Sequence, residues 1–173
     1  ITIGPVIPNH LESVLETLKA TGSKIIIKGN EITIKTKEIK AVNIKTAPFP
    51  GFPTDLQAPF TALMAIAKGN SEISETIYEN RMGHVDLLNS MGASIKLVKN
   101  IAKIQGVDEL RGQNLKGSDL RSTAALIIAA LSAKDTSYIG GLEHLDRGYD
   151  GFESKLNLLG ANITRSFNEQ IFF

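Results

Sequence analysis

The alternation of apolar and polar residues follows the same order three times along the chain. In each copy, leucines spaced along one helix face precede a glycine, and a run with an apolar residue at every second position follows it. The leucine spacing predicts a helix, the glycine its end, and the alternation a β-hairpin that turns at an asparagine. The three copies end near residues 35, 105 and 173, and they align at Leu18, Gly22 and Asn30, at Leu88, Gly92 and Asn100, and at Leu156, Gly160 and Asn168.

A second unit lies between these copies and occurs twice. "TDLQAPFTALMAIAKGNSEI" and "SDLRSTAALIIAALSAKDTSYI" each start with a hydroxyl residue, an aspartate and a leucine, and each continues as an apolar helix and a strand. A third Asp-led unit is expected outside this chain. The sequence thus predicts a single domain over residues 1–173 with an α/β (α+β) fold, in which pseudo-threefold repeats of helix and β-hairpin surround buried helices such as "AALIIAAL".

Composition and charge narrow the class of function. A chain of 173 residues can bury a core, and its formal net charge of +1 gives no general attraction to nucleic acid or to an anionic membrane. The longest apolar run, Ala124 to Leu131, is too short to span a bilayer. The chain has no cysteine, and its three histidines share no metal-ligand spacing. We therefore expect a cytoplasmic protein without a metal site and without nucleic-acid or membrane partners.

The segment "PFPGFPTDLQAPF" holds four of the six prolines and leads into Asp55. Two interpretations of Asp55 are open. An acid in the first turn of a helix, after a threonine, is typical of a structural N-terminus that offsets the helix dipole. A loop stiffened by proline also suits a carboxylate that is held in place for chemistry, since a cap alone does not need this rigidity. The structural alternative applies equally to Asp119, which occupies the same place in the second Asp-led unit.

Arginines occupy equivalent loops ahead of two of the glycine-ended helices. Arg81 lies in "YENRMGHV" and Arg147 in "EHLDRGYDGF". A guanidinium near a helix N-terminus makes a bidentate clamp for carboxylate or phosphate, and Arg121 of "DLR" would join such an anion site. The alternative is that each arginine forms an ordinary surface ion pair, Arg81 with Glu79 and Arg147 with Asp146.

Four segments together resemble the UDP-N-acetylglucosamine enolpyruvyl transferases, the MurA family. They occur in the family's order, cover most of residues 46–162, and read "TAPFPGFPTDLQAPF", "ETIYENRMGHV", "LKGSDLRSTAALIIAAL" and "HLDRGYDGFESKLNLLGA". The resemblance implies that this chain is most of one domain of an enzyme with the inside-out α/β barrel fold. That enzyme moves enolpyruvyl from phosphoenolpyruvate to the 3-hydroxyl of UDP-N-acetylglucosamine by addition–elimination and without a cofactor. This is the first committed step of peptidoglycan synthesis, and hence of cell wall biogenesis.

The resemblance also implies catalytic roles for four residues of this sequence. Asp55 would be the general base that accepts the proton of the sugar hydroxyl. Asp119 and Arg121 would handle protons and support the tetrahedral intermediate. Arg147 would hold phosphoenolpyruvate, a dianionic and carboxylated substrate that requires cations already in place as charge moves.

Further residues would bind the substrates. The resemblance implies that Arg81 contacts phosphoenolpyruvate together with Arg121 and Arg147, and that Ile77 and Tyr78 line the UDP-sugar site. This chain departs from the family at Met82-Gly83, where bulkier apolar residues are usual, so the packing of that loop is expected to differ.

The resemblance implies a partner domain with a mobile catalytic loop, and this loop is absent from the chain, as is the family's phosphoenolpyruvate-contacting lysine. The isolated chain is therefore expected to be inactive, and an exposed interdomain face would favour homo-oligomers. Two other functions are open: a related enolpyruvyl transferase with another acceptor, and a catalytically silent binding domain. The residue on the absent loop, cysteine or aspartate, is also open, as is the origin of the chain as an excised, proteolytic or natural fragment.

Overall fold

The computed structural model describes residues 1–166 and 171–172, in which helices alternate with strands. The strands are β1 (Thr2–Ile3), β2 (Lys24–Lys28), β3 (Glu31–Lys35), β4 (Ile44–Lys45), β5 (Asn70–Ser74), β6 (Ser94–Val98), β7 (Ile101–Gln105), β8 (Asn114–Lys116), β9 (Tyr138–Gly140), β10 (Thr164–Arg165) and β11 (Ile171–Phe172). The helices are α1 (Glu12–Ala20), α2 (Gln57–Ala65), α3 (His84–Ser90), α4 (Leu120–Leu131), α5 (Leu142–Leu145) and α6 (Phe152–Leu158), with 3-10 turns η1 (Pro8–Leu11) and η2 (Thr54–Leu56).

Two of the three sheets share one topology. In one, β4 runs parallel to β5, which pairs antiparallel with β7 and then β6; in the other, β8 runs parallel to β9, followed by β11 and β10. Each sheet is built in the same chain order of lead strand, inner helix, second strand, outer helix and hairpin. In the third sheet, β1-β3-β2, strands β2 and β3 form the hairpin, and β1 pairs with it as β5 and β9 do in the other two sheets. The predicted α/β class with repeated helix and hairpin units is therefore confirmed.

The glycines that align the three copies end helices as predicted. After α1, α3 and α6, each takes a left-handed φ between 94° and 96°: Gly22, Gly92 and Gly160. In the first two hairpins the residue with positive φ is Gly29 or Lys99, and the aligned asparagine directly follows it in the turn. The third aligned asparagine, Asn168, lies outside the described residues.

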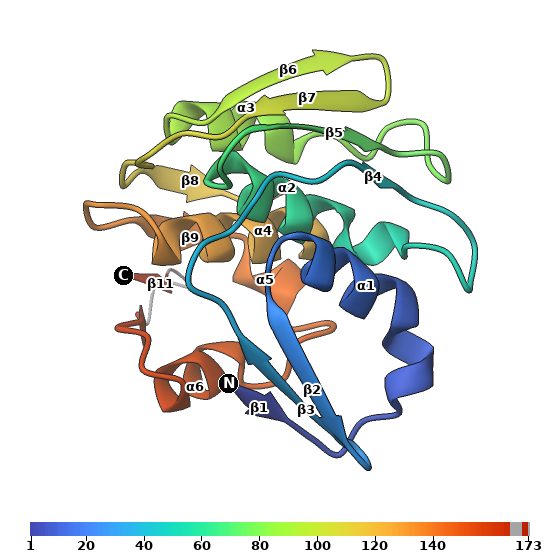
Figure 1. Ribbon diagram of the computed structural model, residues 1–173. Coiled ribbons are helices and arrows are strands. Elements are labelled where there is room, and N and C mark those ends of the chain that lie inside the picture. Colours follow the sequence, from blue (N-terminus) through green and yellow to red (C-terminus); the bar gives the residue numbers. More distant parts are fainter. Residues whose placement is uncertain (167–170, 173) are drawn as a thin grey trace.

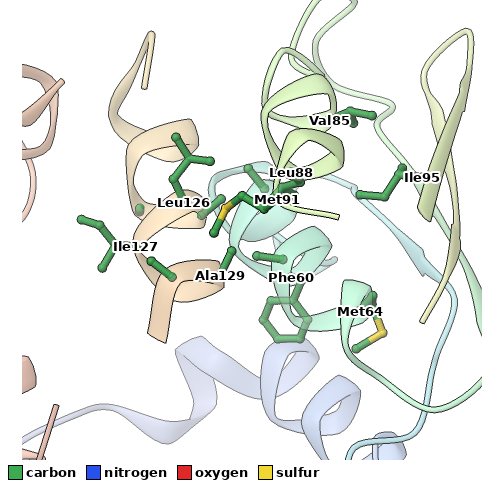
Figure 2. Packing of buried hydrophobic residues seen from close by; sticks show 14 of the residues in the cluster. Phe60, Met64, Val85, Leu88, Met91, Ile95, Leu126, Ile127 and Ala129 are labelled. Atoms are coloured by element: carbon green, nitrogen blue, oxygen red, sulfur yellow. The ribbon is translucent and has the colours of Figure 1, made fainter. Parts of the chain in front are cut away.

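The core lies around α2 and α4, which run side by side through the middle of the molecule (Figure 1). Eight residues of α2 and eight of α4 are buried, which explains why these two segments are apolar on all sides. Figure 2 shows Phe60 and Met64 of α2, Leu88 and Met91 at the end of α3, and Leu126 of α4 gathered in one cluster. No helix in the described part of the chain is long and apolar enough to cross a membrane.

This arrangement brings three loops together at one end of the core. The 3-10 turn η2 leads into α2, the segment after β5 leads to α3, and the N-terminus of α4 follows β8. The register of the parallel strands places Thr46 at the end of β4 beside Glu75 at the end of β5. Most of the site residues predicted from the sequence lie in these three segments.

Candidate active site

The centre of the site is the Asp55 carboxylate, which contacts two arginines. Arg121 donates a hydrogen bond from Nε to Asp55 Oδ1 at 2.6 Å, and its Nη2 lies 2.5 Å from the same oxygen. Arg81 donates to the same Oδ1 through Nη1 at 3.3 Å. The Asp55 side chain remains 66% exposed, and Oδ2 receives no hydrogen bond from the described residues. The site thus presents a fixed carboxylate with one free oxygen beside two cations.

The two aspartates of the Asp-led units differ in their local role. Asp119 is the N-cap of α4: its carboxylate accepts from the backbone N–H of Arg121 and Ser122, and its own N–H donates to Ser122 Oγ. Neither η2 nor α2 has a side-chain cap. Asp119 therefore caps a helix, whereas Asp55 lies in the first turn of η2, as the structural interpretation requires, but caps nothing and directs its carboxylate to arginines.

Local electrostatics fix the charge of two further groups. Burial alone would raise the pKa of the Asp119 carboxyl, but hydrogen bonds from the N–H groups of Ser122 and Arg121 outweigh it and hold that pKa below 3.8. Burial raises the pKa of Tyr149, and the nearby charge of Asp55 raises it further, while Arg121 opposes this shift. At neutral pH the site therefore contains an ionised Asp119 and a protonated phenol.

A cavity of about 710 Å³ opens beside these charges. Its lining includes Ile77, Tyr78, Arg81, Asp119 and Arg121. The guanidinium of Arg81 stacks on the Tyr78 ring at 3.7 Å from its centroid, which holds the cation at the cavity wall. Six of the seven predicted site residues thus line this cavity or, like Asp55, contact its lining.

A slightly larger hollow of about 770 Å³ lies elsewhere, over the sheet of β4, β5, β7 and β6. It is lined by Glu72, Lys103 and other residues and contains none of the predicted site residues. Glu72 and Lys103 already neutralise each other in an ion pair at 3.0 Å. The smaller cavity is therefore the better candidate for chemistry.

Arg147 is the predicted site residue that stands apart. It is exposed in the loop between α5 and α6, does not line the cavity, and forms no hydrogen bond or ion pair with the described residues. The surface pairing considered for it is wrong, because Asp146 pairs with Arg165 at 2.6 Å. Its loop still approaches the site, since Tyr149 lies close enough to Asp55 for that charge to affect its pKa. The surface pairing considered for Arg81 is also wrong, since Arg81 pairs with Asp55.

Two residues of the site were missed by sequence reasoning. Thr54 accepts a hydrogen bond from Arg81 Nη1 at 3.0 Å, and the buried Glu75 accepts one from Thr54 Oγ1 at 2.7 Å. A signal for Glu75 was present in "NSEISE", where alternation puts Ser71, Ile73 and Glu75 on the same, buried face. An acid at that register position requires a network of hydrogen-bond donors around it.

His84 lies inside the protein behind the cavity. It is 2% exposed, its Nε2 is 3.4 Å from Gln57 Nε2, and burial lowers its pKa to about 4 despite the charge of Asp119. His84 is therefore neutral at physiological pH. Among the residues that the structure describes, no group of three histidines or acids could hold a metal ion.

Comparison with known proteins links this site to a family. The profile of the EPSP synthase family, described as 3-phosphoshikimate 1-carboxyvinyltransferase, matches residues 1–156. A UDP-N-acetylglucosamine 1-carboxyvinyltransferase of Prochlorococcus marinus (strain MIT 9312) is 67% identical over 99% of this chain and 38% of that relative. The protein of the same name from Synechococcus sp. (strain CC9605) is 53% identical over 96% of this chain. The chain spans about 38% of the length of these curated relatives.

Solved structures agree on the fold. The enolpyruvyl transferase NikO from Streptomyces tendae has a TM-score of 0.82 and 29% identity over 92% of this chain and 38% of its own. EPSP synthase from Acinetobacter baumannii has a TM-score of 0.72 over 94% of this chain, and at 16% identity it supports the fold alone. The enolpyruvyl transferase type of fold expected from the sequence is confirmed.

Proposed function

The chain belongs to the EPSP synthase family, and on that premise we propose that it forms part of a UDP-N-acetylglucosamine enolpyruvyl transferase. The relatives that support this acceptor are between 53% and 69% identical to the chain. The reaction would join the enolpyruvyl group of phosphoenolpyruvate to the 3-hydroxyl of the sugar and release phosphate. Its product would enter peptidoglycan synthesis in the cytoplasm, which links the protein to cell wall biogenesis, cell shape and division.

The observation that carries the proposal is the orientation of the Asp55 carboxylate. All of its arginine contacts fall on Oδ1, so Oδ2 is available to a substrate hydroxyl. In the addition step, Asp55 takes the hydroxyl proton as the sugar oxygen bonds to C2 of phosphoenolpyruvate, and C3 gains a proton from an acid. In the elimination step, C3 loses a proton and phosphate leaves C2, which restores the double bond.

The cations of the site suit a substrate that carries both carboxylate and phosphate. Arg81 is held by Thr54 and by the Tyr78 ring, and Arg121 is held by Asp55, so both guanidinium groups are in place before an anion binds. Arg147 is exposed in the loop between α5 and α6, and it forms no ion pair with the described residues that a bound anion would have to break. We assign all three to the charge of phosphoenolpyruvate and its tetrahedral adduct.

The remaining predicted residues, Ile77, Tyr78 and Asp119, line the cavity. Ile77 and Tyr78 offer an apolar wall of the cavity, 37% and 51% exposed, which suits the UDP-sugar. Asp119 lies at the cavity as an ionised acid and orients the first turn of α4, from which Arg121 extends. Because the cavity is open, we propose that a partner domain of the same enzyme covers it and completes the site; the exposed apolar wall would otherwise favour homo-oligomers.

The test is phosphate release by the full-length product of the gene, supplied with phosphoenolpyruvate and UDP-N-acetylglucosamine. Asp55→Asn and Arg147→Ala are compared with Lys134→Ala, a surface variant whose ion pair with Glu109 involves no residue of the site. We expect Asp55→Asn to lower kcat by about 10²- to 10⁴-fold, as loss of a general base does. Arg147→Ala should mainly raise KM for phosphoenolpyruvate, and Lys134→Ala should match the wild type.

Two results would contradict the proposal. Phosphate release with shikimate 3-phosphate but not with UDP-N-acetylglucosamine would reassign the acceptor. No release with either acceptor would leave a binding domain that has kept the fold without the activity.

A further inference from the structure

Glu75 is a buried carboxylate directly after β5, and it forms no ion pair with the residues that the structure describes. It is 2% exposed, and its Oε1 accepts from Thr46 Oγ1 at 3.0 Å and from the backbone N–H groups of Ile77 and Tyr78 at 2.7 and 3.1 Å. Its Oε2 accepts from Thr54 Oγ1 at 2.7 Å. Burial alone would raise the pKa of Glu75, but these four hydrogen bonds outweigh it, so the carboxylate stays ionised at neutral pH.

The hydrogen bonds of Glu75 continue to the proposed base. The Thr54 hydroxyl donates its proton to Glu75, and its oxygen accepts from Arg81 Nη1 at 3.0 Å. The same nitrogen contacts Asp55 Oδ1 at 3.3 Å. A single connected network therefore runs from the buried Glu75 carboxylate through a hydroxyl and a guanidinium to the exposed carboxylate of Asp55. The bonds to Ile77 and Tyr78 tie the loop that carries the cavity wall to the same centre.

The second copy of the unit shows that the fold itself does not need this carboxylate. The parallel registers of β4 with β5 and of β8 with β9 make Thr46 equivalent to Gly117, and Glu75 to Gly141. The same backbone hydrogen bond to the neighbouring strand forms at residues 46 and 117, at 3.0 and 3.1 Å. A Cβ on Gly141 would lie 2.4 Å from the carbonyl oxygen of Gly117, so the two backbones are too close at this corner for a side chain at residue 141. Glu75 is thus an addition specific to the copy that carries Asp55.

We propose that Glu75 is a positioning residue for the site. Through Thr54 and the amides of residues 77 and 78, it sets the distance between Arg81 and Asp55 and the place of the cavity wall. Glu75 does not line the cavity, so it acts through these residues and not on the substrate. The effect on turnover rests on the proposed function, whereas the effect on geometry does not.

The first experiment measures turnover in the full-length gene product. Thr54→Val keeps the shape of the side chain and removes the hydroxyl, Thr54→Ser keeps the hydroxyl, and Glu75→Gln removes the charge. The matched control is Asn89→Ala, because Asn89 ties α3 to β6 through two hydrogen bonds of 2.8 and 2.9 Å and lies outside the site.

We expect Thr54→Val and Glu75→Gln each to lower kcat by about 10- to 100-fold, as a small misplacement of catalytic groups does. Thr54→Ser should stay near the wild type, and Asn89→Ala should lower the unfolding midpoint without lowering kcat. The double variant Thr54→Val/Glu75→Gln should have a kcat only slightly below that of the less active single variant, since both substitutions interrupt one network. Additive losses, or losses that follow the unfolding midpoint across all variants, would overturn the proposal.

The second experiment needs no turnover and separates this inference from the proposed function. In crystal structures of the Thr54→Val and Thr54→Ser proteins, the Arg81–Asp55 contact should open beyond about 4 Å in the first and persist in the second. Persistence in both would overturn the positioning role even in an active enzyme. Opening in Thr54→Val would support it even if the acceptor of the reaction proved to be different.

Discussion

Replacing Asp55 and Asp119 separately by alanine tests whether two residues at the same place in a repeat perform different tasks. Asp119→Ala removes the acceptor for the backbone N–H groups of Arg121 and Ser122 at the start of α4. Loss of such an N-cap costs about 0.5–2 kcal/mol, and loss of the negative charge near the helix N-terminus adds roughly 0.3–1 kcal/mol. We expect the free energy of unfolding to fall by about 1–3 kcal/mol.

Asp55→Ala should affect stability much less. Asp55 caps neither η2 nor α2, and its side chain is 66% exposed. An ion pair with that exposure contributes roughly 0–1 kcal/mol, and salt screens it further. The expected loss of unfolding free energy is therefore below about 1 kcal/mol, although the same substitution should abolish most turnover.

Urea unfolding of the 173-residue chain, followed by circular dichroism, measures both effects. The midpoints should shift with little change in the slope of free energy against urea, and Asp119→Asn should recover most of the loss because asparagine caps as well as aspartate. The lowered pKa of Asp119 means that its contribution is present above pH 3.8 and is lost as the pH falls through the lower folded value. The difference between wild type and Asp119→Ala should shrink there. Equal destabilisation by the two alanine substitutions would refute the reasoning.

Two further predictions concern buried and strained positions. The pKa of His84 is about 4 in the folded protein and 6.5 in the unfolded chain, so the unfolded chain takes up the proton first as the pH is lowered. The free energy of unfolding should therefore decrease from pH 6.5 down to pH 4, with a slope approaching about 1.4 kcal/mol per pH unit. His84→Gln should remove that slope in urea midpoints measured across the range; an unchanged slope would place the titration elsewhere. Gly141→Ala combines a left-handed φ of 88° with a Cβ 2.4 Å from the Gly117 oxygen. At Gly151, with φ 55°, an added Cβ meets none of the described residues within 4 Å. Thermal unfolding should show only the backbone cost of about 1–2 kcal/mol for Gly151→Ala and a clearly larger loss for Gly141→Ala, and equal losses would exclude the clash.

The elements could be predicted from the sequence because their signals are local. Leucine spacing, a glycine with left-handed φ and strict alternation each determine the conformation of a few neighbouring residues, and Gly22, Gly92 and Gly160 take the conformation that this pattern requires. The contact of Asp55 with Arg121 could not be predicted in the same way, because the two residues are 66 positions apart. It depends on how α2 packs against α4, which no local pattern encodes.

The different roles of the two aspartates have a local cause that sequence reasoning did not use. Thr123 donates its backbone N–H to the carbonyl of Asp119, which completes the first turn behind the cap. The equivalent residue in the other copy is Pro59, which has no N–H to donate. The turn there starts earlier, with the N–H of Leu56 donating to the carbonyl of Pro53. Asp55 therefore lies inside a turn and not ahead of it, and its carboxylate is free for other partners.

The candidate site is formed by positions at which the two copies of the Asp-led unit carry different residues. Arg121 is equivalent to Gln57, which is fully buried against Thr61 and Met82, whereas Arg121 reaches across to Asp55. Glu75, which anchors the Asp55 side through Thr54, is equivalent to a glycine. Since the shared pattern already accounts for the helices, hairpins and core, these substitutions are not needed for folding. One copy contributes the exposed carboxylate of Asp55 and the other the guanidinium of Arg121 that contacts it, so the candidate chemistry arises from the departures from the repeat.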